Sequence, residues 1–157
     1  MAEKHSFTIW PIPQECIFGT GHLVLSSPLI LATHGDAPWL PVAARQAAEV
    51  LKRAAKGAIP AVVEGEGGGP AWRVTTMETL PPGLEPVLEN EGYFLDVTPS
   101  GVLLAGRDAQ GVFWGAQTLA QLIEGPDCPS LPVVTIRDWP RYPIRGVHCY
   151  LPAREQM

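Results

Sequence analysis

Three arginines stand close together near the C-terminal end of the sequence, and Arg145 is the one for which we consider a functional role. Arg137, Arg141 and Arg145 recur every fourth residue within the stretch 136–146. A guanidinium group presents several N–H donors in a planar fork, which suits neighbouring hydroxyl groups as well as carboxylates. For Arg145 the alternative is an ion pair with an acid such as Asp138, or simple solvation.

The glycine-rich segments do not have the pattern of a phosphate-binding loop. The run 65–69 lacks the Gly-x-Gly-x-x-Gly spacing and is followed by Pro70 and a predicted strand instead of a helix. The segment 106–111 has suitable glycine spacing, but Val112-Phe113 stand where a lysine and a serine or threonine are required. We therefore expect neither segment to bind a nucleotide.

No metal site or nucleophile is indicated by the remaining polar residues. His148 and Cys149 are neighbours on a predicted strand, so they should point to opposite faces. No serine lies in a Gly-x-Ser-x-Gly elbow. Four acids are better explained by loops, a strand face or a helix cap: Glu64, Glu66, Asp96 and Asp108. We predict no catalytic residue, no metal and no cofactor in this chain.

The arginines lie in a connector between two predicted strands, 131–136 and 147–151. Pro140 and Pro143 fix their own φ angles and push the residues before them toward extended conformations. We therefore expect an extended and fairly stiff connector.

Two helices should support this region. The first is predicted over 41–56, where apolar residues recur at helical spacing. The second should begin after the N-cap Asp108 and end near Glu124, before Gly125-Pro126. The apolar stripe of the first helix comprises Leu40, Ala43, Ala47, Val50, Leu51 and Ala54.

The second helix has little polar surface. Its polar stripe comprises Gln110, Gln117, Gln121 and Glu124, with Trp114 beside it, and a face of small residues comprises Gly111, Gly115 and Thr118. Small residues permit close approach of another backbone. A helix with so few polar positions is covered on more than one side. We expect the sheet on one side and a domain outside this chain on the other.

The strand pattern predicts the α+β class, with a mixed, mainly antiparallel sheet and two helices packed on one face. The clearest hairpin spans 93–105 and turns at Pro99-Ser100-Gly101. The chain from 102–105 through the second helix to 131–136 could form a parallel crossover. Further strands are predicted at 7–10, 22–26, 29–32, 59–63 and 72–76, with a turn at 19–21 and an irregular segment at 81–90.

Length and composition limit the classes of protein to which this chain can belong. The 157 residues, 46% hydrophobic, fit one folded unit. A net charge of −5 argues against a general nucleic-acid partner, and the apolar runs are too short for a membrane span. Three cysteines at wide spacing do not form a disulfide framework, and no signal peptide is visible, which favours a cytoplasmic location.

Two ordered motifs resemble glycoside hydrolase family 20, the β-N-acetylhexosaminidases. In that family a small non-catalytic domain ends in Ile-x-Asp-x-Pro-Arg-(Phe/Tyr)-x-x-Arg-Gly, and a catalytic (β/α)8 barrel follows. The matching residues are Ile136, Asp138, Pro140, Arg141, Tyr142, Arg145 and Gly146. The segment 111–122 is similar to the family's Gly-x-(Phe/Tyr)-(Tyr/Trp)-Gly-x-Gln-Thr-Leu-x-Gln-Leu helix. The resemblance covers about residues 7–150.

The resemblance implies an accessory domain over 1–137, and a connector with the first barrel strand over 138–157. It implies that the barrel of the same polypeptide is the partner, and that the domain stabilises it through the small-residue side of the second helix and the connector. Arg145 matches an arginine that hydrogen-bonds hydroxyls of the terminal sugar, so the complete enzyme would bind an amino-sugar glycoside. Tyr150 stands where the family usually has an acidic residue, which leaves the substrate open.

The family's reaction uses the substrate's acetamido oxygen as nucleophile, together with an adjacent Asp-Glu pair in the barrel. No Asp-Glu dipeptide occurs in this sequence, so this chain alone should not be an enzyme. Two alternatives remain open. One is a free-standing carbohydrate-binding module in which Trp114, Trp139 or Tyr142 stacks on sugar rings. The other is a protein-interaction module without a ligand.

Overall fold

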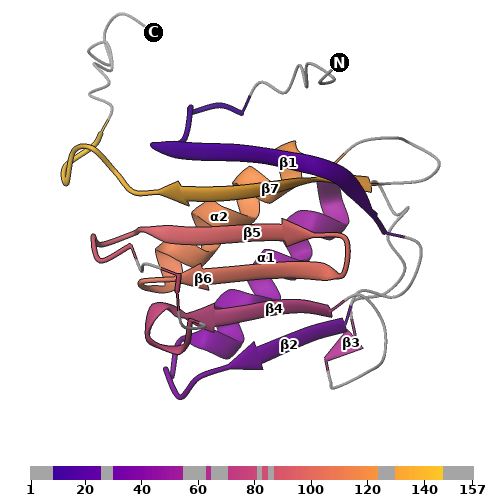
Figure 1. Cartoon of the computed structure of the whole chain (residues 1–157). Coiled ribbons are helices and arrows are strands. Elements are labelled where there is room, and N and C mark those ends of the chain that lie inside the picture. The colour runs from indigo at the N-terminus through magenta and orange to yellow at the C-terminus, as the bar shows by residue number, and fades with distance from the viewer. Residues whose placement is uncertain are drawn as a thin grey trace, which may run out of the picture.

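The computed structural model describes residues 9–25, 30–54, 63–64, 71–80, 83–84, 87–123 and 130–146. A twisted seven-stranded sheet forms one layer, and both helices lie against the same face of it (Figure 1). The elements are β1 (Glu15–Val24), β2 (Ile30–His34), α1 (Leu40–Ala54), β3 (Val63–Glu64), β4 (Ala71–Thr76), a short 3-10 helix η1 (Met77–Thr79), β5 (Tyr93–Thr98), β6 (Gly101–Gly106), α2 (Ala109–Gln121) and β7 (Ser130–Asp138).

The sheet order is β1-β7-β5-β6-β4-β2-β3. The pairings among β1, β7, β5 and β6 are antiparallel, and those among β6, β4, β2 and β3 are parallel, which gives three of each kind. Both β6 and β7 run antiparallel to β5, so α2 joins two strands that point the same way and crosses over β5. The predicted α+β class, mixed sheet and parallel crossover are confirmed.

The 93–105 hairpin is also confirmed, with Pro99 and Ser100 between β5 and β6. The prediction of two strands separated by a turn at 19–21 was wrong. β1 runs continuously beside β7, with a register irregularity between Phe18 and His22. A Cβ on Gly19 would lie 2.7 Å from Val133 Cγ1, and Gly21 has φ +95°. The glycines therefore form a bulge, because pairing with β7 continues on both sides of them.

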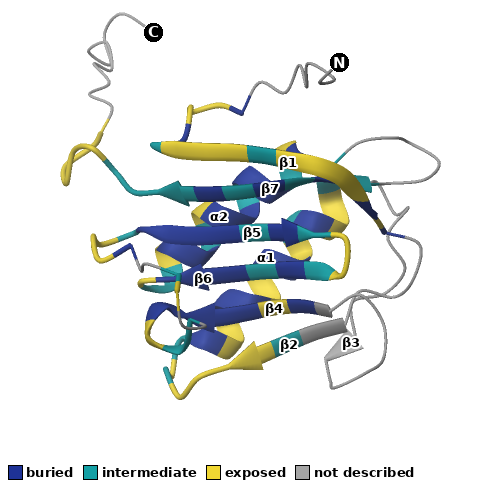
Figure 2. Cartoon of the chain, viewed as in Figure 1, coloured by how far each residue is buried: buried dark blue, intermediate teal, exposed yellow. Residues whose placement is uncertain are grey.

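The main core fills the space between the helices and the sheet (Figure 2). Four of the six residues in the predicted stripe of α1 are buried, namely Leu40, Ala43, Ala47 and Leu51, and Val50 and Ala54 are half-buried. From α2 the residues Val112, Ala116 and Leu119 are fully buried against the same core. Figure 2 shows β5 and β6 mostly buried and β1 largely exposed, so the core centres on the middle of the sheet.

The small-residue face of α2 is covered by this chain itself. A Cβ on Gly111 would lie 2.2 Å from the carbonyl oxygen of Gly92, and one on Gly115 would lie 2.3 Å from Leu104 Cδ1. The hydroxyls of Thr118 and Tyr93 are 2.7 Å apart in a buried hydrogen bond. The expectation that this face awaits another domain was wrong, because β5, β6 and the turn before β5 fill it.

A second, smaller core lies on the opposite face of the sheet. Met77, Val87, Phe94 and Ala105 form it, and Leu103 and Trp139 pack against it. Met77, Leu80, Leu84 and Val87 thus cover part of the outer sheet face. This explains why β6 is apolar on both sides, as the sequence predicted.

Some predicted features lie outside the described residues. They are residues 147–151, most of 59–63, the start of 7–10, the glycine-rich run 65–69, and the ends of both helices at 55–56 and Glu124. Among the described residues, no helix is both long enough and apolar enough to cross a membrane.

Candidate functional site

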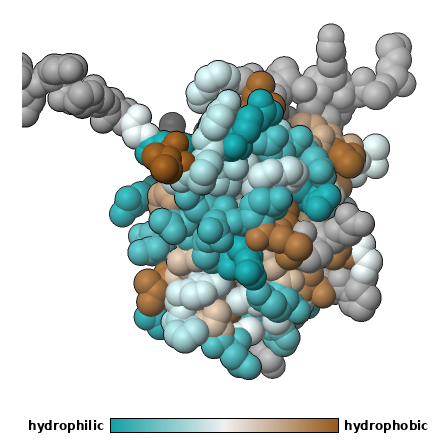
Figure 3. All heavy atoms as spheres, turned by 90° about the vertical axis from the view of Figure 1, so that its left-hand side faces the viewer, coloured by the Kyte–Doolittle hydropathy of each residue, from teal (hydrophilic) through white to brown (hydrophobic). Residues whose placement is uncertain are grey.

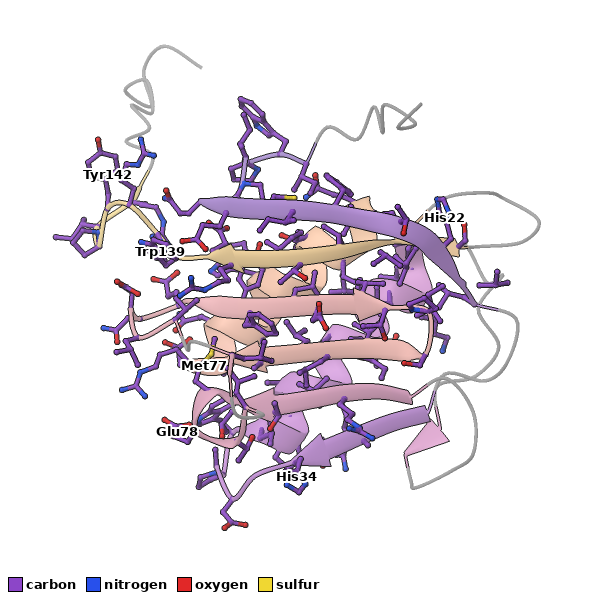
Figure 4. The ribbon with its side chains drawn as sticks, in the orientation of Figure 1. His22, His34, Met77, Glu78, Trp139 and Tyr142 are labelled. Atoms are coloured by element: carbon purple, nitrogen blue, oxygen red, sulfur yellow. The ribbon has the colours of Figure 1, made fainter. Side chains whose placement is uncertain are left out.

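The connector after β7 is bent, so the prediction of an extended connector was wrong. The Nη1 of Arg145 donates a hydrogen bond to the carbonyl oxygen of Tyr142 at 2.9 Å, which closes a local bend. Figure 4 shows Trp139 near the end of the sheet and Tyr142 farther out on the connector. Residues 141–146 are all exposed.

Arg145 forms an ion pair with Glu91, whereas the sequence had suggested Asp138 as a possible acidic partner. The same oxygen, Glu91 Oε2, accepts a hydrogen bond from Trp114 Nε1 at 3.0 Å. Glu91 has φ +60°, a conformation that is uncommon for residues other than glycine, and its N–H donates to Asp108 Oδ2 at 2.8 Å. The carboxylate of Glu91 therefore links α2 to the connector.

Asp138, at the end of β7, holds the segment before β1. Its Oδ1 accepts a hydrogen bond from the Gln14 N–H at 3.1 Å. Burial raises the pKa of Asp138 above its ordinary value, although the nearby Gln14 and Trp139 N–H groups and the Tyr93 hydroxyl favour its charged form. The side chain of Gln14 continues the link to Trp139 O at 3.4 Å.

The three arginines do not converge on one site. Arg137 forms an ion pair with Glu15 on β1, with an N–O distance of 2.9 Å. Arg141 donates to Gln14 Oε1 at 3.4 Å. Arg145 alone reaches α2 through Glu91. Their regular spacing in the sequence therefore does not produce a shared anion-binding cluster.

The three aromatic residues of the binding-module alternative have different environments. Tyr142 is 67% exposed, and Trp114 is 43% exposed. Trp114 packs edge to face with Phe113, with ring centroids 5.1 Å apart. Trp139 packs against the second core, so its ring is not a free platform.

The acids Asp96 and Asp108 make structural hydrogen bonds, and the histidines His22 and His34 lie far from each other. Asp108 caps α2, as predicted, by accepting from the Gly111 N–H at 2.8 Å. Asp96 accepts a hydrogen bond from the Thr135 hydroxyl at 2.8 Å on the outer sheet face. His22 and His34 lie near opposite edges of the sheet (Figure 4). Within the described ranges, no three His, Cys, Asp or Glu side chains gather as a possible metal site.

Glu91 is the residue of this region that sequence reasoning missed. Nothing in its neighbours 88–90 marks it as an anchor, because its role depends on where the turn before β5 places it beside α2. Gln14 and Gln121 were likewise missed, and Gln121 exchanges two hydrogen bonds with the backbone of Trp10, at 2.8 and 3.1 Å.

The fold and the site define a small α+β domain in which surface hydrogen bonds join the segment 10–14 to α2 and to the end of β7. Comparison with known proteins identifies the family to which this domain belongs. The family model described as "Glycosyl hydrolase family 20, domain 2" matches residues 6–139 of this chain. This match covers most of the chain, and the chain belongs to glycosyl hydrolase family 20 as its domain 2.

Individual relatives agree with this assignment. The chain is 38% identical over 74 residues to a beta-hexosaminidase of Akkermansia muciniphila, covering 46% of this chain and 15% of that protein. It is 23% identical over 143 residues to the N,N'-diacetylchitobiase of Vibrio harveyi, covering 90% of this chain and 15% of that protein. The chain thus spans less than a fifth of the length of either relative.

A solved structure supports the same family. The N-acetyl-beta-hexosaminidase of Streptomyces plicatus superimposes with a TM-score of 0.62 at 26% identity, covering 83% of this chain and 26% of that chain.

Proposed function

We propose that this chain is the non-catalytic domain of a glycoside hydrolase that acts on N-acetylhexosaminides, and that it stabilises the catalytic barrel of the same polypeptide. The observation that carries this proposal is the family match over residues 6–139, followed by the motif residues of the connector. We assign residues 1–137 to the accessory domain, and 138–157 to the connector and first barrel strand.

The geometry around β7 supports a role in positioning the connector. Asp138 Oδ1 accepts a hydrogen bond from the Gln14 N–H, and the Gln14 side chain donates to Trp139 O, so the segment before β1 fixes the point where the connector leaves the sheet. Such a fixed exit would hold the following domain at a defined distance from the sheet. The cytoplasmic location is part of the same proposal and is supported by the widely spaced cysteines.

For Arg145 we propose contact with hydroxyl groups of the terminal sugar in the complete protein. In this chain it is bonded to Glu91, and the two side chains are 44% and 23% exposed. A partly exposed ion pair of this kind is worth about 0–1 kcal/mol, so replacing it with sugar contacts costs little. Glu91 would keep its bond to Trp114 Nε1 after the exchange.

The experiment is to express the complete reading frame that contains this chain and to assay chromogenic glycosides. We expect hydrolysis of a β-N-acetylhexosaminide and none of the corresponding β-glucoside, because the latter lacks the acetamido nucleophile. The 157-residue chain alone should hydrolyse neither. Equal cleavage of both glycosides by the complete protein would contradict the proposal.

In the complete protein, Arg145→Lys should reduce kcat/KM by roughly ten- to a hundredfold, the loss expected for one or two charge-assisted hydrogen bonds. Arg141→Lys is the matched control, because Arg141 contacts Gln14 within this domain. Equal activity of the Arg145 variant and the wild type would exclude the sugar contact.

A second candidate is sugar binding by this chain alone, and the exposure of Tyr142 and Trp114 favours it. Titration of the chain with N-acetylglucosamine and its oligomers, followed by tryptophan fluorescence, tests it. Saturable quenching that is lost in Tyr142→Ala would support a binding module. Absence of any change up to millimolar sugar would exclude it.

A further inference from the structure

We infer that Glu91 competes with the substrate for Arg145, so that the complete protein binds its sugar more weakly and with an affinity that depends on ionic strength. The inference rests on the proposed function, in which Arg145 contacts hydroxyl groups of the terminal sugar. It adds a residue outside the connector that determines how much of the arginine is available. Glu91 lies in the turn before β5, 54 positions from Arg145 in the sequence.

Both terminal nitrogens of Arg145 have an acceptor within this chain. Nη1 donates to the carbonyl oxygen of Tyr142 at 2.9 Å, and Nη2 donates to Glu91 Oε2. A guanidinium binds neighbouring hydroxyl groups through the paired N–H donors of its planar fork. A sugar that takes up these paired donors must therefore replace the Glu91 carboxylate.

Glu91 is the more firmly held partner of this ion pair. Its N–H donates to Asp108 Oδ2 at 2.8 Å, and its Oε2 accepts from Trp114 Nε1 at 3.0 Å. The Glu91 side chain is 23% exposed, whereas that of Arg145 is 44% exposed and belongs to the segment 141–146, in which every residue is exposed. When the pair opens, the arginine therefore moves and the carboxylate stays bonded to Trp114.

The ion pair lies on a hydrophilic side of this chain. The turn before β5 and the connector are at the same end of the sheet (Figure 1). Figure 3 looks at this end, and its surface is mostly hydrophilic with separate hydrophobic side chains. Salt screens exposed charges, because the Debye length falls from about 10 Å at 0.1 M to about 3 Å at 1 M ionic strength. The competition should therefore weaken as salt is added.

The size of the effect follows from the exposure of the pair. An exposed ion pair shifts an equilibrium by up to about fivefold. If the substrate binds only the form in which Arg145 is free, the apparent dissociation constant rises by the inverse of the fraction of that form. Loss of the competing contact should therefore lower KM by about two- to fivefold. It should leave kcat unchanged, because Glu91 has already released Arg145 when the substrate is bound.

The ion pair between Arg107 and Glu78 provides a matched control. Its N–O distance is 2.8 Å, and its side chains are 41% and 64% exposed. It joins the end of β6 to η1 and includes no residue of the connector. Removing this pair changes the surface charge as the loss of the Glu91 pair does, but it leaves Arg145 with its acceptor.

The contact itself is tested in the 157-residue chain, by the NMR resonance of the Trp114 indole N–H. Arg145→Gln should shift this resonance, because Arg145 and Trp114 bond to the same oxygen of Glu91. Arg141→Gln should leave it in place, because Arg141 bonds to Gln14 instead. No shift in the Arg145 variant would show that the competing contact does not form, and it would overturn the inference.

The competition is tested in the complete protein, by kcat and KM for an uncharged chromogenic β-N-acetylhexosaminide at about 0.05 M and about 0.5 M sodium chloride. Glu91→Gln keeps an oxygen for the Trp114 N–H and removes the charge. We expect its KM at low salt to lie two- to fivefold below that of the wild type, and the two KM values to converge at high salt. Glu78→Gln should match the wild type at both salt concentrations.

An unchanged KM in the Glu91 variant would overturn the inference while the proposed function stands. A higher KM would overturn it as well, because Glu91 would then hold Arg145 in the position that the sugar requires. Hydrolysis of no β-N-acetylhexosaminide by the wild type would be a different failure. It would contradict the proposed function and, with it, any competition for the sugar.

Discussion

Asp138 joins the end of β7 to the segment before β1 through Gln14, and it lies opposite Tyr93 of β5 in the sheet register. Since burial raises the pKa of Asp138 in the folded state, the folded protein binds this proton more tightly than the unfolded chain does. The contribution of Asp138 to stability is therefore greatest below its ordinary pKa of 3.8, and it declines as the pH rises through the raised value.

This predicts that Asp138→Asn flattens the pH dependence of stability above pH 4. Asparagine keeps an oxygen for the Gln14 N–H and does not titrate. Urea unfolding at a series of pH values from about 4 to 7 measures the difference in slope between the two proteins. Parallel curves for the variant and the wild type would contradict this role of Asp138.

Gly111 is the residue at which α2 approaches the turn before β5 most closely. Gly111→Ala would gain about 1 kcal/mol of helix propensity, but its Cβ would overlap the backbone of Gly92, and such overpacking costs about 1–3 kcal/mol or more. We expect net destabilisation, measured by chemical unfolding. Gln110→Ala, one residue away and exposed, is the control, and a Gly111 variant as stable as this control would be inconsistent with the packing described.

At the scale of single residues, the sequence predicted what depends on local chemistry. Asp108 was recognisable as an N-cap because a capping side chain bonds two or three residues ahead. The partner of Arg145 was not recognisable, because Glu91 lies 54 positions away and reaches it only through the fold. The three arginines are close in the sequence but have separate partners in the structure.

At the scale of elements, the carboxylate of Asp108 accepts two hydrogen bonds at the start of α2. One carboxylate oxygen caps Gly111, and the other accepts the N–H of Glu91. Asp108→Ala should therefore lower the free energy of unfolding by about 1–2 kcal/mol, or more because a second N–H is lost. Asp108→Asn should cost less, since its amide oxygen can still cap the helix. Equal losses in the two variants, measured by thermal or urea unfolding, would argue against the cap.

The elements also show where periodicity succeeds and fails as a guide. Both helices and the 93–105 hairpin were predictable from apolar spacing and turn residues. The glycines at 19–21 were not interpretable locally, because β7 decides whether they form a turn or a bulge. The small-residue face of α2 was identified correctly, but only the fold shows that Gly92, Leu104 and Tyr93 fill it.

At the scale of the whole molecule, the described part of the chain is one sheet with two helices on one face, and the chain belongs to glycosyl hydrolase family 20. The segment 10–14 bonds both to the end of α2 and to the end of β7. In the function that we propose, this domain packs against the barrel that follows the connector and stabilises it. The stability of the two parts should then be coupled, as it is across a large domain interface.

The most direct test of this account is the temperature at which the complete protein loses hydrolytic activity, measured for the wild type and for Asp108→Ala. If this domain stabilises the barrel, weakening α2 should lower the inactivation temperature together with the unfolding temperature of the domain, in a single calorimetric transition. If the domain unfolds at a lower temperature while activity persists unchanged to the wild-type temperature, the stabilising role is contradicted.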